Sequence, residues 1–177
     1  MIARVALVSI AVAASGCTLV EVEATLEETC LTYKELEIEA PPVALGGDIA
    51  HSFEFDDLGG LQDLAEIDAD IHFVRFGARA LSGIDSFDFV EAATVTIRSA
   101  DPDSDLAPLI AYHCAGTCDT AGAAIDIPAP TDVDALDYLA EDALAVDLVL
   151  SGQVPTEDFT ISADICVEGR VSYSLEP

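Results

Sequence analysis

The chain has 177 residues, of which 34 are Asp or Glu and only 6 are Lys or Arg, so its formal net charge is −28. This charge leaves no basic footprint for nucleic acid and no basic patch for anionic lipid headgroups. Hydrophobic residues make up 51% of the chain, which is enough apolar material for the core of one folded domain.

Residues 1–16 predict a secretory signal peptide. Arg4 gives a positive start, residues 5–14 form a predominantly apolar run, and two small residues then precede Cys17. The apolar run is too short to span a bilayer, which needs about 20 residues. The first acid is Glu21, so the composition changes abruptly after the cysteine.

The four residues Ala14-Ser15-Gly16-Cys17 resemble the lipobox of bacterial lipoproteins. In that family the signal peptide is cut before the cysteine, a diacylglycerol is attached to its thiol and the new amino group is acylated. The resemblance implies that Cys17 is lipidated and anchors the protein to a membrane. Thr18 is not the aspartate that retains such proteins at the inner membrane, so the resemblance implies an outer-membrane lipoprotein facing the periplasm or the cell exterior. The alternative is ordinary secretion, with Cys17 free or disulfide-bonded.

Residues 17–29 are expected to form the lipidated N-terminus and an acidic tether, or a first strand. A two-residue period follows, in which Leu36 and Ile38 share one face while glutamates at 35, 37 and 39 share the other. The same alternation predicts further strands at residues 49–56, 71–81, 87–97, 109–114, 124–127, 144–150 and 159–175.

Two of these strands carry a more specific expectation. In the strand over 71–81, Arg75 and Arg79 are expected on one face, and the other face is expected to hold Val74, Phe76, Ala78 and Ala80. In the last strand, Gly169 marks either a tight hairpin or a glycine bulge in one long strand.

Short helices are expected in two places. One covers residues 58–67 and is capped by Asp57, and its apolar spacing comes from Leu58, Leu61, Leu64 and Ile67. The other follows a capping box from Thr131 to Asp134, and its apolar side holds Val133, Leu136 and Leu139. Eight or nine strands with few helices predict a mainly β protein, in which residues 30–177 form a single β-sandwich with Greek-key, immunoglobulin-like or jelly-roll-like connections.

Five cysteines occur, and four remain if Cys17 carries lipid. An even number suits an oxidising compartment, and we expect two disulfides, Cys114–Cys118 and Cys30–Cys166. The first closes a loop of small residues, and the second ties together the ends of the domain. The competing interpretation is a zinc site built from His113, Cys114, Cys118 and Asp119, but no second ligand pair accompanies it.

Two further sets of residues are candidates for ligand sites. Asp101, Asp103 and Asp105 have the spacing of a calcium loop, although the glycine and the final glutamate of an EF-hand are missing. Three arginines share the electrically neutral window of residues 71–100, either to neutralise acids on neighbouring strands or to bind an anionic ligand: Arg75, Arg79 and Arg98.

The sequence contains no catalytic signature. His51, His72 and His113 are scattered, and no nucleophile elbow, zinc-protease motif or phosphate-binding glycine loop accompanies them. We therefore expect a lipid-anchored bacterial envelope protein with a non-enzymatic structural or binding domain. It would need no cofactor, it would not bind nucleic acid, and an envelope protein is its expected partner. Calcium-dependent adhesion through acidic loops, and a hydrolase of unrecognised type, are the alternatives.

Overall fold

The computed structural model describes residues 20–175 except 41–46, 67, 117, 131–132, 142 and 154. The lipobox, Cys17 and the signal peptide lie outside the described residues. In chain order the elements are β1 (Val20–Ile38), β2 (Gly47–Phe55), the 3-10 helix η1 (Leu61–Glu66), β3 (Asp68–Ser82), β4 (Val90–Ser99), β5 (Leu109–Ala115), β6 (Asp119–Ala121), β7 (Ala124–Pro128), α1 (Leu136–Leu139), β8 (Leu144–Gly152) and β9 (Phe159–Leu175).

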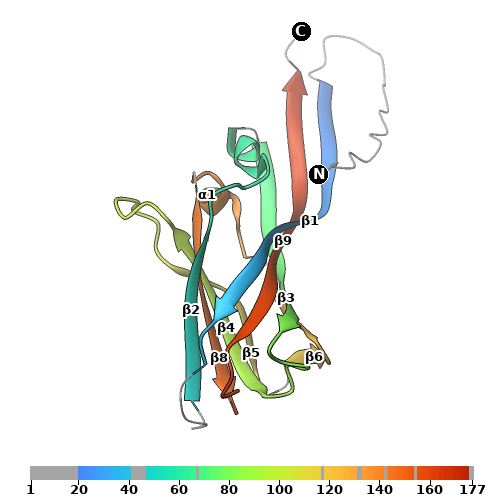
Figure 1. Cartoon of the computed structure of the whole chain (residues 1–177). Helices are drawn as coiled ribbons and strands as arrows, with labels where there is room; N and C mark the ends of the chain where they lie inside the picture. Colours follow the sequence, from blue (N-terminus) through green and yellow to red (C-terminus); the bar gives the residue numbers. More distant parts are fainter. Residues whose placement is uncertain are drawn as a thin grey trace.

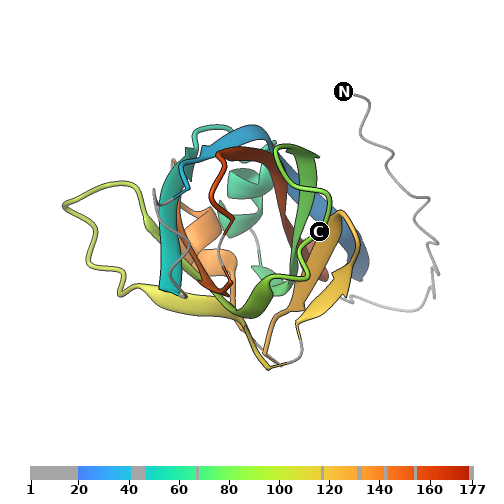
Figure 2. The same ribbon diagram turned by 60° about the horizontal axis from the view of Figure 1, so that its bottom comes forward.

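The described strands form two antiparallel sheets that face each other (Figure 1, Figure 2). One sheet has five strands in the order β1-β9-β3-β7-β6, and the other has four in the order β2-β8-β4-β5. The strands pair from the chain ends inward, because β1 pairs with β9, β2 with β8, β3 with β7 and β4 with β5. Such nested pairing describes one long antiparallel hairpin rolled into two sheets, which is a jelly roll. The predicted β-sandwich is confirmed, in its jelly-roll form.

Alternating side chains from both sheets fill the space between them. Phe73 and Phe76 of β3 lie with their ring centroids 5.9 and 6.0 Å from that of Tyr112, which comes from β5 in the opposite sheet. The Tyr112 hydroxyl donates to the carbonyl oxygen of Cys166, and burial raises the pKa of this phenol. The solvent side of β1 follows the predicted pattern, since Leu36 and Ile38 are buried while the glutamates beside them are exposed.

The expected facing of β3 is wrong at Val74. Phe73 pairs with Val167 and Arg75 with Cys166, so Val74 is one extra residue on β3. This β-bulge shifts the alternation, and the core face therefore carries Phe73 before the bulge and Phe76 after it. Arg75 and Arg79 still face outward, as expected, because both follow the bulge.

The two helices are shorter than expected. Only residues 61–66 are helical in the first, as a 3-10 helix, and the Asp57 carboxylate accepts a hydrogen bond from Gly59 N instead of capping it. Ile67 lies outside the described residues. The second helix is a single turn that begins at Leu136, whose N–H donates a hydrogen bond to the Asp134 carboxylate. Thr131, the expected cap, is outside the described residues.

The two longest strands, β1 and β9, extend together beyond the four-stranded sheet (Figure 1). Residues 20–29, for which a tether or a first strand was expected, form the first part of β1. Gly169 makes no hairpin, because β9 continues through it and pairs with Leu26 on one side and Ile71 on the other. A Cβ at Gly169 would lie 2.2 Å from the carbonyl oxygen of Asp70, so the close strand approach requires glycine.

Candidate functional site

The outer face of the five-stranded sheet holds the candidate site. Arg75 lies there on β3, with its Nε 2.6 Å from Glu28 Oε1 and its Nη1 3.0 Å from Asp126 Oδ1. Glu28 comes from β1 and Asp126 from β7, so one guanidinium joins strands on both sides of β3. Burial lowers the pKa of Arg75, but the hydrogen bonds and charges of the two carboxylates outweigh it and the net shift is upward.

The three arginines singled out in the sequence are not one patch. Arg75 and Arg79 share the outer face of β3, whereas Arg98 lies on β4 in the other sheet. Arg98 Nε is 3.1 Å from Asp147 Oδ2. Burial raises the pKa of Asp147, but hydrogen bonds from Ser52 and Arg98 and the charge of Arg98 outweigh that effect and lower it. Arg75 and Arg98 therefore neutralise acids on neighbouring strands.

A hollow of about 360 Å³ lies over Gly77, between Arg75 and Arg79. A Cβ at Gly77 would lie 3.0 Å from Arg75 Nη1 and 3.3 Å from Asp126 Oδ1, so the glycine leaves room for that ion pair. Asp164 also borders the hollow and accepts a hydrogen bond from the Thr32 hydroxyl at 2.6 Å. Because carboxylates surround the guanidinium of Arg75, this arginine offers an anion little uncompensated positive charge.

Both expected disulfides are present. Cys30 and Cys166 are register partners on β1 and β9, with an S–S distance of 2.07 Å, and the bond lies beside Arg75, whose Nη2 is 3.8 Å from Cys30 Sγ. Cys114 and Cys118 are joined at 2.01 Å. The zinc interpretation is wrong, because both of its thiols are consumed in this bond. Within the described part of the chain, one set of three potential metal ligands converges, Glu28 with Cys30 and Cys166, and its two sulfurs are also disulfide-bonded.

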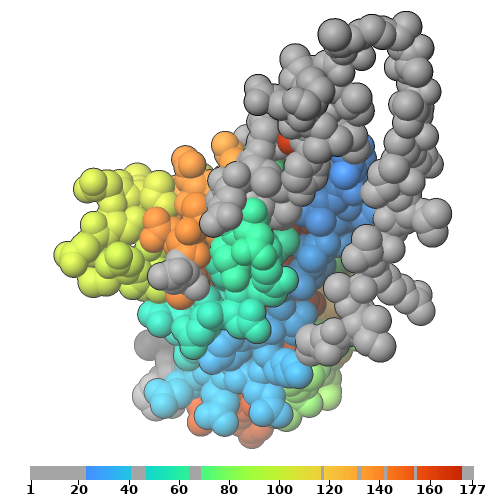
Figure 3. Space-filling view, turned by 90° about the horizontal axis from the view of Figure 1, so that it is seen from above, coloured from blue at the N-terminus to red at the C-terminus, as the bar shows by residue number. Residues whose placement is uncertain are grey.

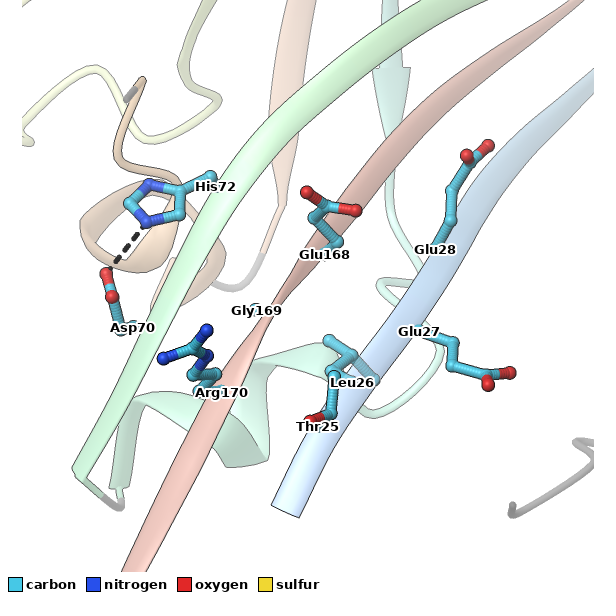
Figure 4. Close-up of a pocket in the computed structure, with 9 residues that line it drawn as sticks. All are labelled: Thr25, Leu26, Glu27, Glu28, Asp70, His72, Glu168, Gly169 and Arg170. Carbon is cyan, nitrogen blue, oxygen red and sulfur yellow. Dashed lines mark ion pairs between the residues drawn. The ribbon is translucent and has the colours of Figure 1, made fainter. Parts of the chain in front are cut away.

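A larger hollow of about 650 Å³, called here the ribbon hollow, lies where β1, β9 and β3 leave the sandwich (Figure 4). It forms because β1 has two residues, Glu27 and Glu28, opposite the single Glu168 of β9. The bulge separates the strands, and Gly169 contributes no side chain to fill the gap. The lining residues are Thr25, Leu26, Glu27, Glu28, Asp70, His72, Glu168, Gly169 and Arg170.

His72 lies at the rim of the ribbon hollow. Its Nε2 is 2.9 Å from Asp70 Oδ1, and Glu168 is its register partner on β9. Sequence reasoning missed this hollow, although Gly169 between a glutamate and an arginine was its visible signal. The other histidines lie elsewhere, His51 on β2 and His113 on β5, where Thr94 bonds its Nδ1 at 3.1 Å. The three histidines are not brought together.

The acidic loop after β4 does not gather its carboxylates. Asp101 Oδ1 accepts a hydrogen bond from Asp103 N at 2.9 Å, so this carboxylate closes its own turn. Glu141 accepts hydrogen bonds from Ser99 and Ser104 and ties the loop to the sandwich. Figure 3 shows the loop projecting sideways from the molecule. Calcium binding by Asp101, Asp103 and Asp105 stays a prediction. None of the helices in the described ranges has the length and apolar character needed to cross a bilayer.

No protein-family model matches the chain, and no curated protein matches it. Solved structures of viral coat proteins are similar to it at low levels. The decameric BFDV capsid protein aligns at 11% identity and a TM-score of 0.42, over 85% of this chain and 99% of that one. The Tobacco streak virus coat protein aligns at 13% identity and a TM-score of 0.29, over 85% and 90%. A turnip yellow mosaic virus structure aligns at 13% identity and a TM-score of 0.27, over 97% and 91%. The jelly roll of this chain is established by its own strand order.

Proposed function

We propose that the protein is a lipid-anchored envelope protein of a bacterium, held to the outer membrane by acyl chains on Cys17. Its jelly roll serves as a structural or binding module for another envelope component and not as an enzyme. The observation that carries the proposal is Gly16-Cys17 directly after an apolar run that follows Arg4.

Two properties of the folded domain support this proposal. The disulfides Cys30–Cys166 and Cys114–Cys118 suit an oxidising compartment outside the cytoplasm. Removal of residues 1–16 takes away Arg4 and no acid, so the net charge of −28 becomes −29 in the mature chain. Such a strongly acidic surface keeps the domain in water while the anchor holds it at the membrane.

The intact mass of the protein extracted from bacterial membranes tests the proposal. We expect loss of residues 1–16 and added acyl mass on Cys17. A Cys17→Ser variant, expressed in the same cells, should carry no acyl mass. A soluble mature form with an unmodified Cys17 thiol would overturn the proposal.

A further inference from the structure

We propose that the protein stands on the membrane in one fixed orientation, with its ribbon end against the lipid surface. The ribbon end is the part of β1 and β9 paired from Val20–Leu175 to Leu26–Gly169. The opposite end, with the connections at residues 83–89 and 155–158, then faces away and is free to meet a partner. This inference rests on the proposed lipidation of Cys17.

The connection between anchor and strand is very short. β1 begins at Val20, three residues after Cys17. Three residues span at most about 11 Å, whatever conformation they adopt. The first hydrogen-bonded residue of the domain is therefore held close to the headgroups.

The ribbon end is fixed to the sandwich, so the direction of β1 sets the direction of the whole domain. β9 pairs with β1 on one edge and with β3 on the other, from Asp68–Ser172 to Ile71–Gly169. Below the ribbon hollow, the Cys30–Cys166 bond joins β1 to β9, and the ion pair of Arg75 with Glu28 joins β1 to β3 across β9. An edge strand paired on one side only would otherwise peel away from its neighbour when pulled at its end.

The charge of this end decides how it meets lipid. At the ribbon end and directly below it, exposed carboxylates outnumber basic groups, because Arg170 is accompanied by Glu23, Glu27, Glu28, Asp70 and Glu168. Anionic headgroups repel this end, while the short connection prevents it from moving away. The Debye length is about 8 Å at physiological ionic strength, which is similar to the reach of the connection. The repulsion between the headgroups and these carboxylates is therefore not fully screened, and it keeps the ribbon pointing away from the membrane plane.

The two ends are well separated. β3 continues for 11 residues from Ile71, beside the ribbon end, to Ser82 at the opposite loops, which corresponds to about 36 Å of strand. Thr25 is exposed on the ribbon end and Thr156 is exposed in the connection from β8 to β9. Replacing either threonine by lysine makes the same chemical change, so the two positions are a matched pair for labelling.

Energy transfer from a lysine-bound fluorophore to an acceptor in the headgroups tests the orientation. Lys34 is the only lysine of the chain, so Lys34→Arg provides an unlabelled background. Into this background go Thr25→Lys or Thr156→Lys, and the full protein is reconstituted in vesicles of phosphatidylcholine and phosphatidylglycerol. We expect strong transfer from position 25 and at least fivefold weaker transfer from position 156. Equal transfer from both positions would overturn the fixed orientation.

Failure of the anchor and failure of the orientation give different results. If Cys17 is acylated but transfer is equal from both positions, the proposed orientation fails and the proposed anchor stands. If the mass shows an unmodified Cys17, the proposed anchor fails, and the free Cys17 thiol is then coupled to maleimide lipid in the same vesicles. Unequal transfer in that preparation still supports the orientation that the short connection imposes, and equal transfer rejects it.

Discussion

The two sheets of the jelly roll differ in their regularity. β2 and β8 pair without a register shift from Gly47–Gly152 to Phe55–Leu144. The pairs of β9 with β1 and with β3 each contain two shifts. Both hollows described above lie on the outer face of the sheet that holds β9. In the four-stranded sheet, β4 pairs with β8 and with β5 through one shift each, so this sheet is the more regular of the two. The extra residues and glycines of the five-stranded sheet create its surface features.

In each sheet, carboxylates on other strands nevertheless neutralise one outward-facing arginine in a similar way. Arg75 contacts two carboxylates on two other strands, and Arg98 contacts one. The neutral window of residues 71–100 thus lies on central strands of both sheets, surrounded by acidic strands. The comparison predicts that changes in the five-stranded sheet have larger effects than matched changes in its partner.

The largest effect is expected from the disulfides. Cys30–Cys166 closes a loop with a sequence separation of 136, and Cys114–Cys118 closes one of 4. Loop entropy then predicts losses of about 5 and about 2 kcal/mol in the free energy of unfolding. Urea unfolding of Cys30→Ala/Cys166→Ala and Cys114→Ala/Cys118→Ala measures the two losses. Equal losses would mean that the long-range tie does not constrain the unfolded chain.

Gly169→Ala should be the next most harmful change. Its Cβ would meet backbone atoms of β3, so the strands must move apart at a cost of about 2–3 kcal/mol. Gly77→Ala is the matched control, because its closest neighbour is the mobile end of the Arg75 side chain. We expect that control to cost less than half as much in urea unfolding. A milder effect for Gly169→Ala than for Gly77→Ala would contradict the close strand approach.

Loss of the arginines should have smaller effects, because both side chains are more than a third exposed and solvent weakens their ion pairs. Arg75→Gln leaves Glu28 and Asp126 without their shared partner and should cost about 1 kcal/mol. Arg98→Gln frees only Asp147 and should cost about half of that. Thermal melts at low salt measure the difference, which should shrink in high salt. Equal losses of stability from Arg75→Gln and Arg98→Gln would contradict the expected difference between the two sheets.

The smallest effect concerns pH. The pKa of Asp147 is lowered in the folded protein, so its contribution to stability is complete above the unfolded pKa and is lost as the pH falls through the lower folded pKa. The stability difference between the protein and Asp147→Asn, a few tenths of a kcal/mol at neutral pH, should disappear in acid. Arg98→Gln should raise the pKa of Asp147 and move that loss to higher pH. Urea unfolding between pH 3 and 7 follows both, and a stability difference that does not change with pH would show that folding does not lower the pKa of Asp147.

Much of this architecture is predictable from local sequence. Alternation at Leu36 and Ile38 places the core face of β1, and cysteine counting identifies both disulfides. The bulge at Val74 is not predictable in this way, because it exists only relative to the register of β9. The ribbon hollow depends on two bulged glutamates of β1 meeting Gly169 from a strand more than a hundred residues later. Local periodicity carries no information about such long-range register.

The membrane anchor is the central claim, and partition of the protein between membrane and soluble fractions tests it most directly. Each buried CH₂ contributes about 0.8 kcal/mol, so two or more acyl chains hold a protein on the membrane through high-salt and alkaline washes. We predict that the unaltered protein stays with the washed membranes and that Cys17→Ser is released. Release of both, or retention of both, would contradict anchoring through Cys17.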